Sequence, residues 1–347
     1  MGCDEGRRID DPRAGPELEL VSSYPAEGDG LGCRPGGPPD CGIPINAGVE
    51  LRFDRYLLPS SAIRQSMVFF TGTEQLSVFA EPHYDVAERV LRYAPQPGQV
   101  LHPGARYRVH LELPAENEDG FGLRAFDGEP LSPDGPVPLD FSFRTQDGPP
   151  PEVTADPIPA CPEVLGVLRR GGCSSVVCHR SATTPGCPVG YARTDDGPCV
   201  GVPRMDLDLG SAEGLLRTAL SKVAHQTDTE SSAGVPTELP LRFGLGMPII
   251  DPGRPDNSYL VYKMIVNRDS YGPDPCGGSA YEVGLGGQCL VGSVAELDRL
   301  RDWFVRGEPM PPAANRSPPG AADLGLVERW ILGGAKTNDC DVNPGAE

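Results

Sequence analysis

The sequence predicts a protein of two domains, in which an all-β sandwich precedes a mostly α-helical domain. Before residue 146, apolar and polar residues alternate in short segments, which is typical of half-buried strands. The stretch 147–160 is rich in proline and aspartate and lacks apolar periodicity, which predicts a stiff linker. After residue 160 the apolar residues take up helical spacing. We therefore expect a flexible N-terminus at 1–17, a sandwich at 18–146, a helical domain at 161–340 and a tail at 341–347.

The composition indicates folded domains and argues against anionic partners. Hydrophobic residues make up 38% of the 347 residues, which is enough to build two buried cores. The 44 glycines and 40 prolines predict many turns and short elements. A formal net charge of −19 repels nucleic acid and anionic membranes, and no basic patch offsets it. We expect no nucleic-acid partner.

Three segments of the first domain alternate with a period of two. In 49–57, Val49, Leu51 and Phe53 alternate with polar residues. The same pattern recurs in 105–113 and 139–145, where the expected inward residues are Tyr107, Val109, Leu111, Leu139, Phe141 and Phe143. Proline and glycine turns bound the segments, as in a sandwich.

The order of motifs in this half resembles the bacterial Ig-like domains of surface-layer and envelope proteins. The motifs are "SSYPAEG", "LRFDRYL", "LHPGARYRV" and "FSFRT", and they cover about 18–146. The chain departs from that pattern by a Gly/Pro-rich insertion at 29–42, which Cys33 and Cys41 could staple. The resemblance implies a module that binds, spaces or presents rather than catalyses.

Three helices are expected in the second half. The first, in 161–173, has Pro162 in its first turn, and Gly171 and Gly172 end it just before Cys173. The second, in 293–307, opens with a Ser-x-x-Glu capping box, and the third lies in 321–335. Their expected apolar faces are Val164, Leu165 and Leu168; Leu297, Leu300 and Phe304; and Leu324, Val327 and Ile331.

Directly after the first helix, Cys173 and Cys178 are followed by His179. A c-type haem site usually has two residues between its cysteines, whereas this site has four. Two interpretations remain open. The segment is either a stretched haem-attachment site or a small disulfide loop that ends in histidine.

A methionine between prolines offers a partner for such a site. Met310 lies in "RGEPMPP", where a helix cannot form, and its thioether is a soft ligand that suits haem iron. Met247, which precedes a proline, is the runner-up. Met205 alternates with leucines as a core residue would, and His225 is expected near a helix end in solvent.

The order of these features resembles class I cytochromes c, most closely the envelope cytochrome c-like domains of planctomycetes and myxobacteria. The shared stretches are "PRMDLDLGS", "DPGRPDNSYLVYKMI", "MPP" and "VERWILGGA". The resemblance implies one haem c, with thioether bonds to Cys173 and Cys178. It also implies His179 and Met310 as iron ligands on opposite faces.

The eleven cysteines predict an oxidising compartment. Three local pairs lie in Gly/Pro-rich loops: Cys33 with Cys41, Cys187 with Cys199, and Cys276 with Cys289. In the cytochrome-like fold the first and last helices pack together, so the resemblance also makes a Cys161–Cys340 bond reasonable. Sequence alone does not fix the connectivity. The start "MGCDEG" resembles the N-terminus of a mature bacterial lipoprotein, and in such a protein Cys3 would carry the lipid.

These observations predict a non-enzymatic envelope electron-transfer protein with one haem c and an unknown redox protein partner. It would lie in the periplasm or at the outer membrane, with membrane contact only through a lipid on Cys3. The alternative is a haem-free envelope lipoprotein whose modules serve binding or structure. A haem enzyme is disfavoured because a methionine ligand would leave the iron without an open position.

Overall fold

A computed structural model describes most of the first half of the chain and separate parts of the second. The described residues are 15–34, 36–38, 40–76, 79, 82–114, 122–152, 157–174, 183–184, 191–193, 199–201, 207–224, 246–266, 294–303, 305 and 320–340. They divide into two compact units, one on each side of residues 153–156.

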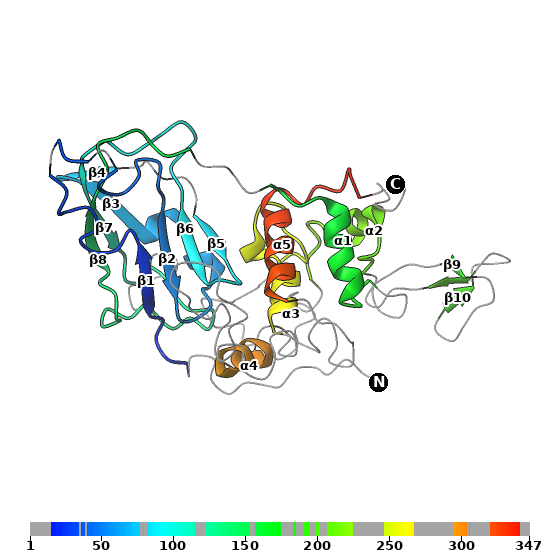
Figure 1. Ribbon diagram of the computed structural model, residues 1–347. Helices are drawn as coiled ribbons and strands as arrows, with labels where there is room; N and C mark the ends of the chain where they lie inside the picture. The colour runs from blue at the N-terminus through cyan, green and yellow to red at the C-terminus, as the bar shows by residue number, and fades with distance from the viewer. Residues whose placement is uncertain are drawn as a thin grey trace. The chain divides into compact units, whose positions relative to one another are not determined.

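The first unit is a sandwich of two antiparallel sheets with four strands each (Figure 1). One sheet has the order β1-β2-β6-β5 and the other β4-β3-β7-β8. With the strands lettered along the chain and β4 taken as C′, these orders read A-B-E-D and C′-C-F-G. That is the arrangement of an immunoglobulin-like sandwich, as the sequence predicted. The strands are β1 Leu20–Tyr24, β2 Val49–Phe53, β3 Met67–Thr71, β4 Glu74–Leu76, β5 His83–Asp85, β6 Val90–Tyr93, β7 Arg106–Leu111 and β8 Asp140–Arg144; the 3-10 helices η1 Pro59–Ser61 and η2 Arg64–Ser66 join β2 to β3.

The three predicted strand segments become β2, β7 and β8. Val49, Leu51 and Phe53 of β2 are fully buried. The inward residues of β7 and β8 form an aromatic cluster with β3, in which the ring of Phe69 stacks on Tyr107 at 4.9 Å. Tyr107 in turn stacks on Phe143 at 5.6 Å. Period-two alternation therefore identified the apolar core residues of β2, β7 and β8, whereas Leu139, which was also expected to point inward, lies before β8 and is half-buried.

One polar position of β2 differs from the alternation. Arg52 was expected in solvent, yet its side chain is only 4% exposed. The turn before β6 covers it, because its Nη1 donates to the carbonyl of Glu88 at 3.1 Å and the Glu88 carboxylate lies 3.7 Å away. Burial raises the pKa of Glu88, and Arg92, which donates to the Glu88 carboxylate at 2.7 Å, opposes that rise. A covering turn from another strand leaves no trace in the β2 sequence.

The motifs that carried the Ig-like resemblance hold one turn together. The hydroxyl of buried Tyr107 accepts a hydrogen bond from the His102 amide at 2.7 Å, which is the tyrosine corner of this fold class. Thr145, at the end of "FSFRT", donates its hydroxyl to the His102 carbonyl at 2.6 Å and accepts from the Ala105 amide at 3.0 Å. Strands β7 and β8 are therefore fastened to the same turn.

The expected linker is attached to both units. The buried side chain of Gln146 donates to the carbonyl of Pro149, and Asn46 donates to the carbonyl of Pro151 at 3.2 Å. Residues 147–151 therefore belong to the sandwich. At the other end, Ile158 lies against Gly333 of the second unit. Within the predicted stretch 147–160, only 153–156 lie outside the described residues.

The described parts of the second unit contain five α-helices, and the helices expected at 161–173, 293–307 and 321–335 are among them (Figure 1). A small sheet of the order β10-β11-β9 was not predicted. Within the described ranges no helix is long and apolar enough to cross a lipid bilayer. The elements are α1 Cys161–Arg170, β9 Thr183–Thr184, β10 Tyr191–Arg193, β11 Cys199–Gly201, α2 Ala212–Thr218, the 3-10 helix η5 Pro255–Asn257, α3 Tyr259–Ile265, α4 Val294–Trp303 and α5 Ala321–Leu332.

The tyrosine corner gives a direct test of the sandwich. The substitution Tyr107→Phe removes the acceptor of the His102 amide and should lower the free energy of unfolding by about 1 kcal/mol. Urea denaturation of the full chain measures this loss. Tyr24→Phe on β1 is the matched control, because no described residue hydrogen-bonds its hydroxyl. Equal losses in the two variants would show that the corner contributes nothing.

Candidate functional site

Helix α1 leads directly to the first cysteine of the expected haem-attachment site. Val164, Leu165 and Leu168 are buried, as the spacing predicted, and Cys161 and Val167 are buried with them. Pro162 stands in its first turn, where the missing amide hydrogen costs no helical hydrogen bond. The helix therefore forms where the sequence placed it, with its apolar side toward the unit's core.

The chain turns sharply between α1 and Cys173. The helix is capped at Gly171, and Gly172 takes a φ of 74°, which glycine adopts without strain. The Ser174 amide then donates to the carbonyl of Leu168 at 3.2 Å. This contact folds Cys173 back toward the last turn of α1, and Cys173 is only 2% exposed. The two glycines thus place the cysteine inside the unit.

A disulfide and an ion pair join α1 to α5 at opposite ends. Cys161 at the start of α1 is bonded to Cys340, eight residues beyond the end of α5, with 4.7 Å between their Cα atoms. At the other end of α1, Arg170 pairs with Asp323 in the first turn of α5 at 2.8 Å. The two helices therefore run side by side in opposite directions. The bond that the sequence suggested between the ends of this domain is confirmed.

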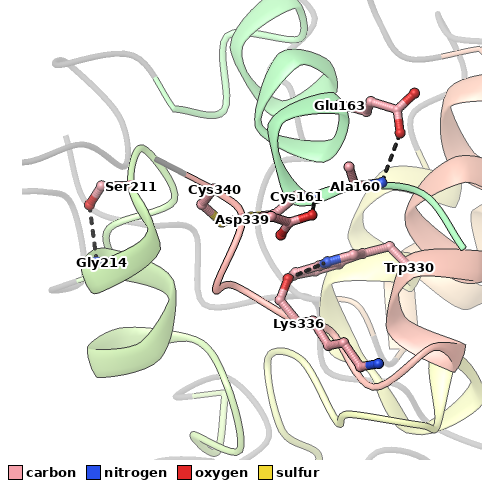
Figure 2. The surroundings of a disulfide bond; sticks show 9 residues. All are labelled: Ala160, Cys161, Glu163, Ser211, Gly214, Trp330, Lys336, Asp339 and Cys340. Carbon is pink, nitrogen blue, oxygen red and sulfur yellow. Dashed lines mark hydrogen bonds between the residues drawn. A yellow bond between two sulfur atoms is a disulfide. The ribbon is translucent and has the colours of Figure 1, made fainter. Parts of the chain in front are cut away.

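Figure 2 shows how the chain around the disulfide is held. Asp339 accepts from the Cys161 amide at 3.4 Å, which places a carboxylate at the N-terminus of α1, where the helix dipole favours negative charge. Glu163 accepts from the Ala160 amide at 2.8 Å and caps the same end. The indole of Trp330, which is 1% exposed, donates to the Lys336 carbonyl at 2.9 Å and folds the last segment over α5.

The stretch "DPGRPDNSYLVYKMI" forms η5 and α3 beside α5. The Ser258 hydroxyl donates to the Arg254 carbonyl at 2.8 Å and accepts from the Asp251 amide at 2.9 Å. The Tyr262 hydroxyl donates to the Asp256 carbonyl at 2.8 Å. All seven residues of α3 are buried, so this helix lies in the centre of the unit.

Met247, the runner-up iron ligand, lies in the core of the same unit. It is 1% exposed, and its carbonyl accepts from the Ala224 amide at 2.9 Å. The next residues continue this pairing, since the Ile249 amide donates to the Lys222 carbonyl at 2.7 Å. The backbone at Met247 is therefore fixed.

The structure describes some of the predicted site residues and not others. Cys173 and Met247 are described, and so are the disulfides Cys33–Cys41 and Cys161–Cys340, which confirm two of the four predicted pairs. Cys199 is described only as the first residue of β11. The remaining predicted or weighed residues lie outside the described part of the chain: Cys3, Cys178, His179, Cys187, Met205, His225, Cys276, Cys289 and Met310. Among the described residues, no group of three or more His, Cys, Asp or Glu side chains could hold a metal ion.

Sequence reasoning missed the contacts that fix the first and last helices. Arg170 and Asp323 are 153 residues apart and show no local pattern. Asp339 stands next to a predicted disulfide cysteine, and that neighbourhood was the one available signal for its role.

Comparison with known proteins adds little to this geometry. No protein-family model matches the chain, and no curated protein matches it. Three solved structures of the bacterial S-layer protein SbsC align with it at 8% identity. The alignment with rSbsC(31-844) has a TM-score of 0.26 and covers 54% of this chain and 22% of that structure. The alignment with the N-terminal part of SbsC has a TM-score of 0.23 and covers 46% of this chain and 35% of that structure. The alignment with SbsC domains 1–6 has a TM-score of 0.25 and covers 55% of this chain and 22% of that structure. The chain thus spans well under two thirds of each, and TM-scores this low carry no argument about its fold or function.

The Cys161–Cys340 disulfide should contribute more to the free energy of unfolding of its unit than the Cys33–Cys41 disulfide contributes to that of the sandwich. Cys161 and Cys340 are 179 residues apart, and closing so long a loop is worth about 5 kcal/mol in the chain-entropy estimate. Cys33 and Cys41 are 8 apart, which corresponds to about 2–3 kcal/mol. The double variant Cys161→Ser, Cys340→Ser should therefore lose more unfolding free energy than Cys33→Ser, Cys41→Ser.

Calorimetry of both variants checks this order, because the two units can unfold as separate transitions. The first variant should lower only the transition of the helical unit, and the second only that of the sandwich. A helical-unit transition that keeps its midpoint without Cys161 and Cys340 would contradict the role given to this bond.

Proposed function

We propose that this chain is an electron-transfer protein of the bacterial cell envelope, in which an Ig-like module carries a helical domain with one c-type haem. Cys173 and Cys178 would hold the haem covalently, and His179 and Met310 would ligate its iron. Haem iron with histidine and methionine ligands exchanges one electron at a raised reduction potential.

The position of Cys173 is the observation that carries the proposal. A helix with one buried face ends at Gly171, and the cysteine follows it inside the unit. This agrees with the order expected for a cytochrome c-like domain, in which the attachment site follows the first helix. Burial of Cys173 fits a macrocycle that is itself held against apolar surface, since burying such a group supplies binding energy.

The pairing of α1 with α5 supports the same proposal. The resemblance to cytochrome c-like domains implies first and last helices that pack together, and here a disulfide and an ion pair join α1 to α5 and the segment after it. Both disulfides also favour an oxidising compartment, which agrees with a location in the periplasm or at the outer membrane. Lipid attachment at Cys3 remains a prediction.

The residues of the chain would have separate tasks in this function. Buried Leu165 and Leu168 belong to the apolar core that would keep water from the site, and the fixed turn at Gly171 and Gly172 would orient the first cysteine. The Ig-like sandwich would act as a spacer that presents the helical domain to its redox partner. No substrate turnover is proposed, because two protein ligands leave no open position on the iron.

The four-residue spacer favours a second candidate. In an oxidising compartment Cys173 and Cys178 can form a disulfide with each other, and the chain would then be a haem-free envelope protein whose modules serve binding or structure.

Haem loading distinguishes the two candidates. Protein purified from a host that attaches c-type haem should be coloured and contain one haem per chain, measured by its pyridine haemochrome spectrum. Cys173→Ser with Cys178→Ser should remove the colour, whereas the control Cys33→Ser with Cys41→Ser should keep it, because that pair lies in the other unit. Colourless wild-type protein from such a host would exclude haem.

The sixth ligand can be assigned with a matched pair of substitutions. Met310→Leu and Met247→Leu each replace a thioether by a hydrocarbon of similar volume, so packing changes little. Met310→Leu should remove the sulfur-to-iron absorption band and lower the reduction potential, while Met247→Leu should leave both unchanged. The opposite result would make Met247 the ligand.

A further inference from the structure

The edge of β8 that faces away from β7 is covered by an earlier segment of the chain, within residues 27–43. Strand β8 is the last strand of its sheet and pairs with β7 on one side only. On its other side, the Gly28 amide donates to the Ser142 carbonyl, and the Arg144 amide donates to the Asp29 carbonyl, both at 2.8 Å. The Ser142 amide donates to the carboxylate of Glu27 at 2.6 Å.

The end of the same segment continues this pairing. The Ile43 amide donates to the Arg144 carbonyl at 2.9 Å, and the Gln146 amide donates to the Ile43 carbonyl at 2.8 Å. These groups are the ones through which an edge strand would bind a further strand. We call the segment 27–43 the edge guard, because its two ends, residues 27–29 and 43, form hydrogen bonds with β8 and the residues after it, from Ser142 to Gln146.

Two glycines let the edge guard approach β8 this closely. Gly30 and Gly42 have φ angles of 69° and 110°, which residues other than glycine rarely adopt. A Cβ atom at Gly30 would overlap the Arg144 carbonyl oxygen, and one at Gly42 would lie 2.8 Å from the Thr145 carbonyl carbon. Gly36 also has a positive φ, of 72°, but open space around it. The close approach therefore depends on Gly30 and Gly42 and not on Gly36.

The disulfide closes the guard between these two glycines. Cys33 and Cys41 have Cα atoms 5.7 Å apart and are separated by eight residues. Closing this loop reduces the freedom of the segment, so that both of its ends reach β8 together.

An uncovered β8 would fit a second copy of itself. Two β8 strands paired antiparallel about Ser142 place Asp140 of each copy opposite Arg144 of the other. Both charges lie on the outer face, while Phe141 and Phe143 point into the core. Such a pairing is twofold symmetric and self-complementary, as the commonest homodimer interfaces are.

The other edge strands of the sandwich are less suited to pairing with a second copy of the chain. Strands β4 and β5 have three residues each, which is too short for stable pairing. Next to β1, the chain before the strand is covered, because the Leu18 amide donates to the Pro130 carbonyl and the Ser132 amide donates to the Leu18 carbonyl. Strand β8, with five residues, is longer than β4 and β5, and its sequence is self-complementary in antiparallel pairing.

We propose that the edge guard keeps the chain monomeric by blocking antiparallel β8–β8 pairing between two copies. This inference rests on the sandwich alone and is independent of haem binding.

Displacing the guard tests the proposal. In the full-length chain, Gly42→Ala and the double variant Cys33→Ser, Cys41→Ser should each form a concentration-dependent dimer in light scattering, while the wild type stays monomeric. Amide exchange at Ser142 and Arg144, measured at a dilution where monomers prevail, should accelerate at least about tenfold.

Two further variants sharpen the result. Gly36→Ala has the same backbone strain without the close approach, so it should behave as the wild type. Adding Arg144→Asp to Gly42→Ala should abolish the dimer, because like charges would then face each other at Asp140. If Gly42→Ala fails to unfold cooperatively, the cysteine variant decides, since it opens the loop without placing a Cβ atom against β8.

The proposal is overturned if the cysteine variant stays monomeric, whether or not its β8 amides exchange faster. Dimers that form equally in Gly36→Ala, or that survive Arg144→Asp, would also overturn it, because the contact would then lie elsewhere.

Discussion

The Cys161–Cys340 disulfide joins the first residue of α1 to the segment beyond α5, and the arrangement of the helical unit depends on this link. The described helices of this unit have 7 to 12 residues, which is too short to be stable in isolation. Their stability has to come from packing, and the disulfide keeps α1 and α5 together while they pack. The exposed ion pair of Arg170 with Asp323 adds little energy but sets the direction of the pair. Because Cys173 follows α1 after a fixed glycine turn, the position of the candidate site is set by the same link.

The two units meet the demands of a chain rich in glycine and proline in different ways. In the sandwich, aromatic stacking fills the core, and the tyrosine corner and the edge guard satisfy backbone groups that a strand end or an edge would leave open. In the helical unit, the Cys161–Cys340 disulfide and the buried central helix α3 hold the short helices together. Both solutions use disulfides, which is consistent with one oxidising compartment for the whole chain.

The sequence predicted the features that have a local signature. Period-two alternation identified β2, β7 and β8, helical spacing identified α1, α4 and α5, and the position of Pro162 and Gly171 predicted both ends of α1. Burial of Arg52 by Glu88, the edge guard on β8 and the contact of Arg170 with Asp323 were not predictable, because each joins segments whose proximity exists only in the fold. The sheet of β9 to β11 was missed because its strands have two or three residues, too few for a periodic pattern. For the candidate site, the order of helix α1 and Cys173 was predictable from the sequence, whereas the haem ligation remains a proposal.

Mass spectrometry of the peptide that contains Cys173, Cys178 and His179 tests the central claim most directly. The protein should come from a host that attaches c-type haem and should be digested without reduction. The account predicts a single peptide that carries one haem through both cysteines, and no Cys173–Cys178 disulfide. A peptide of unmodified mass less two hydrogens, with the two cysteines bonded to each other, would contradict it.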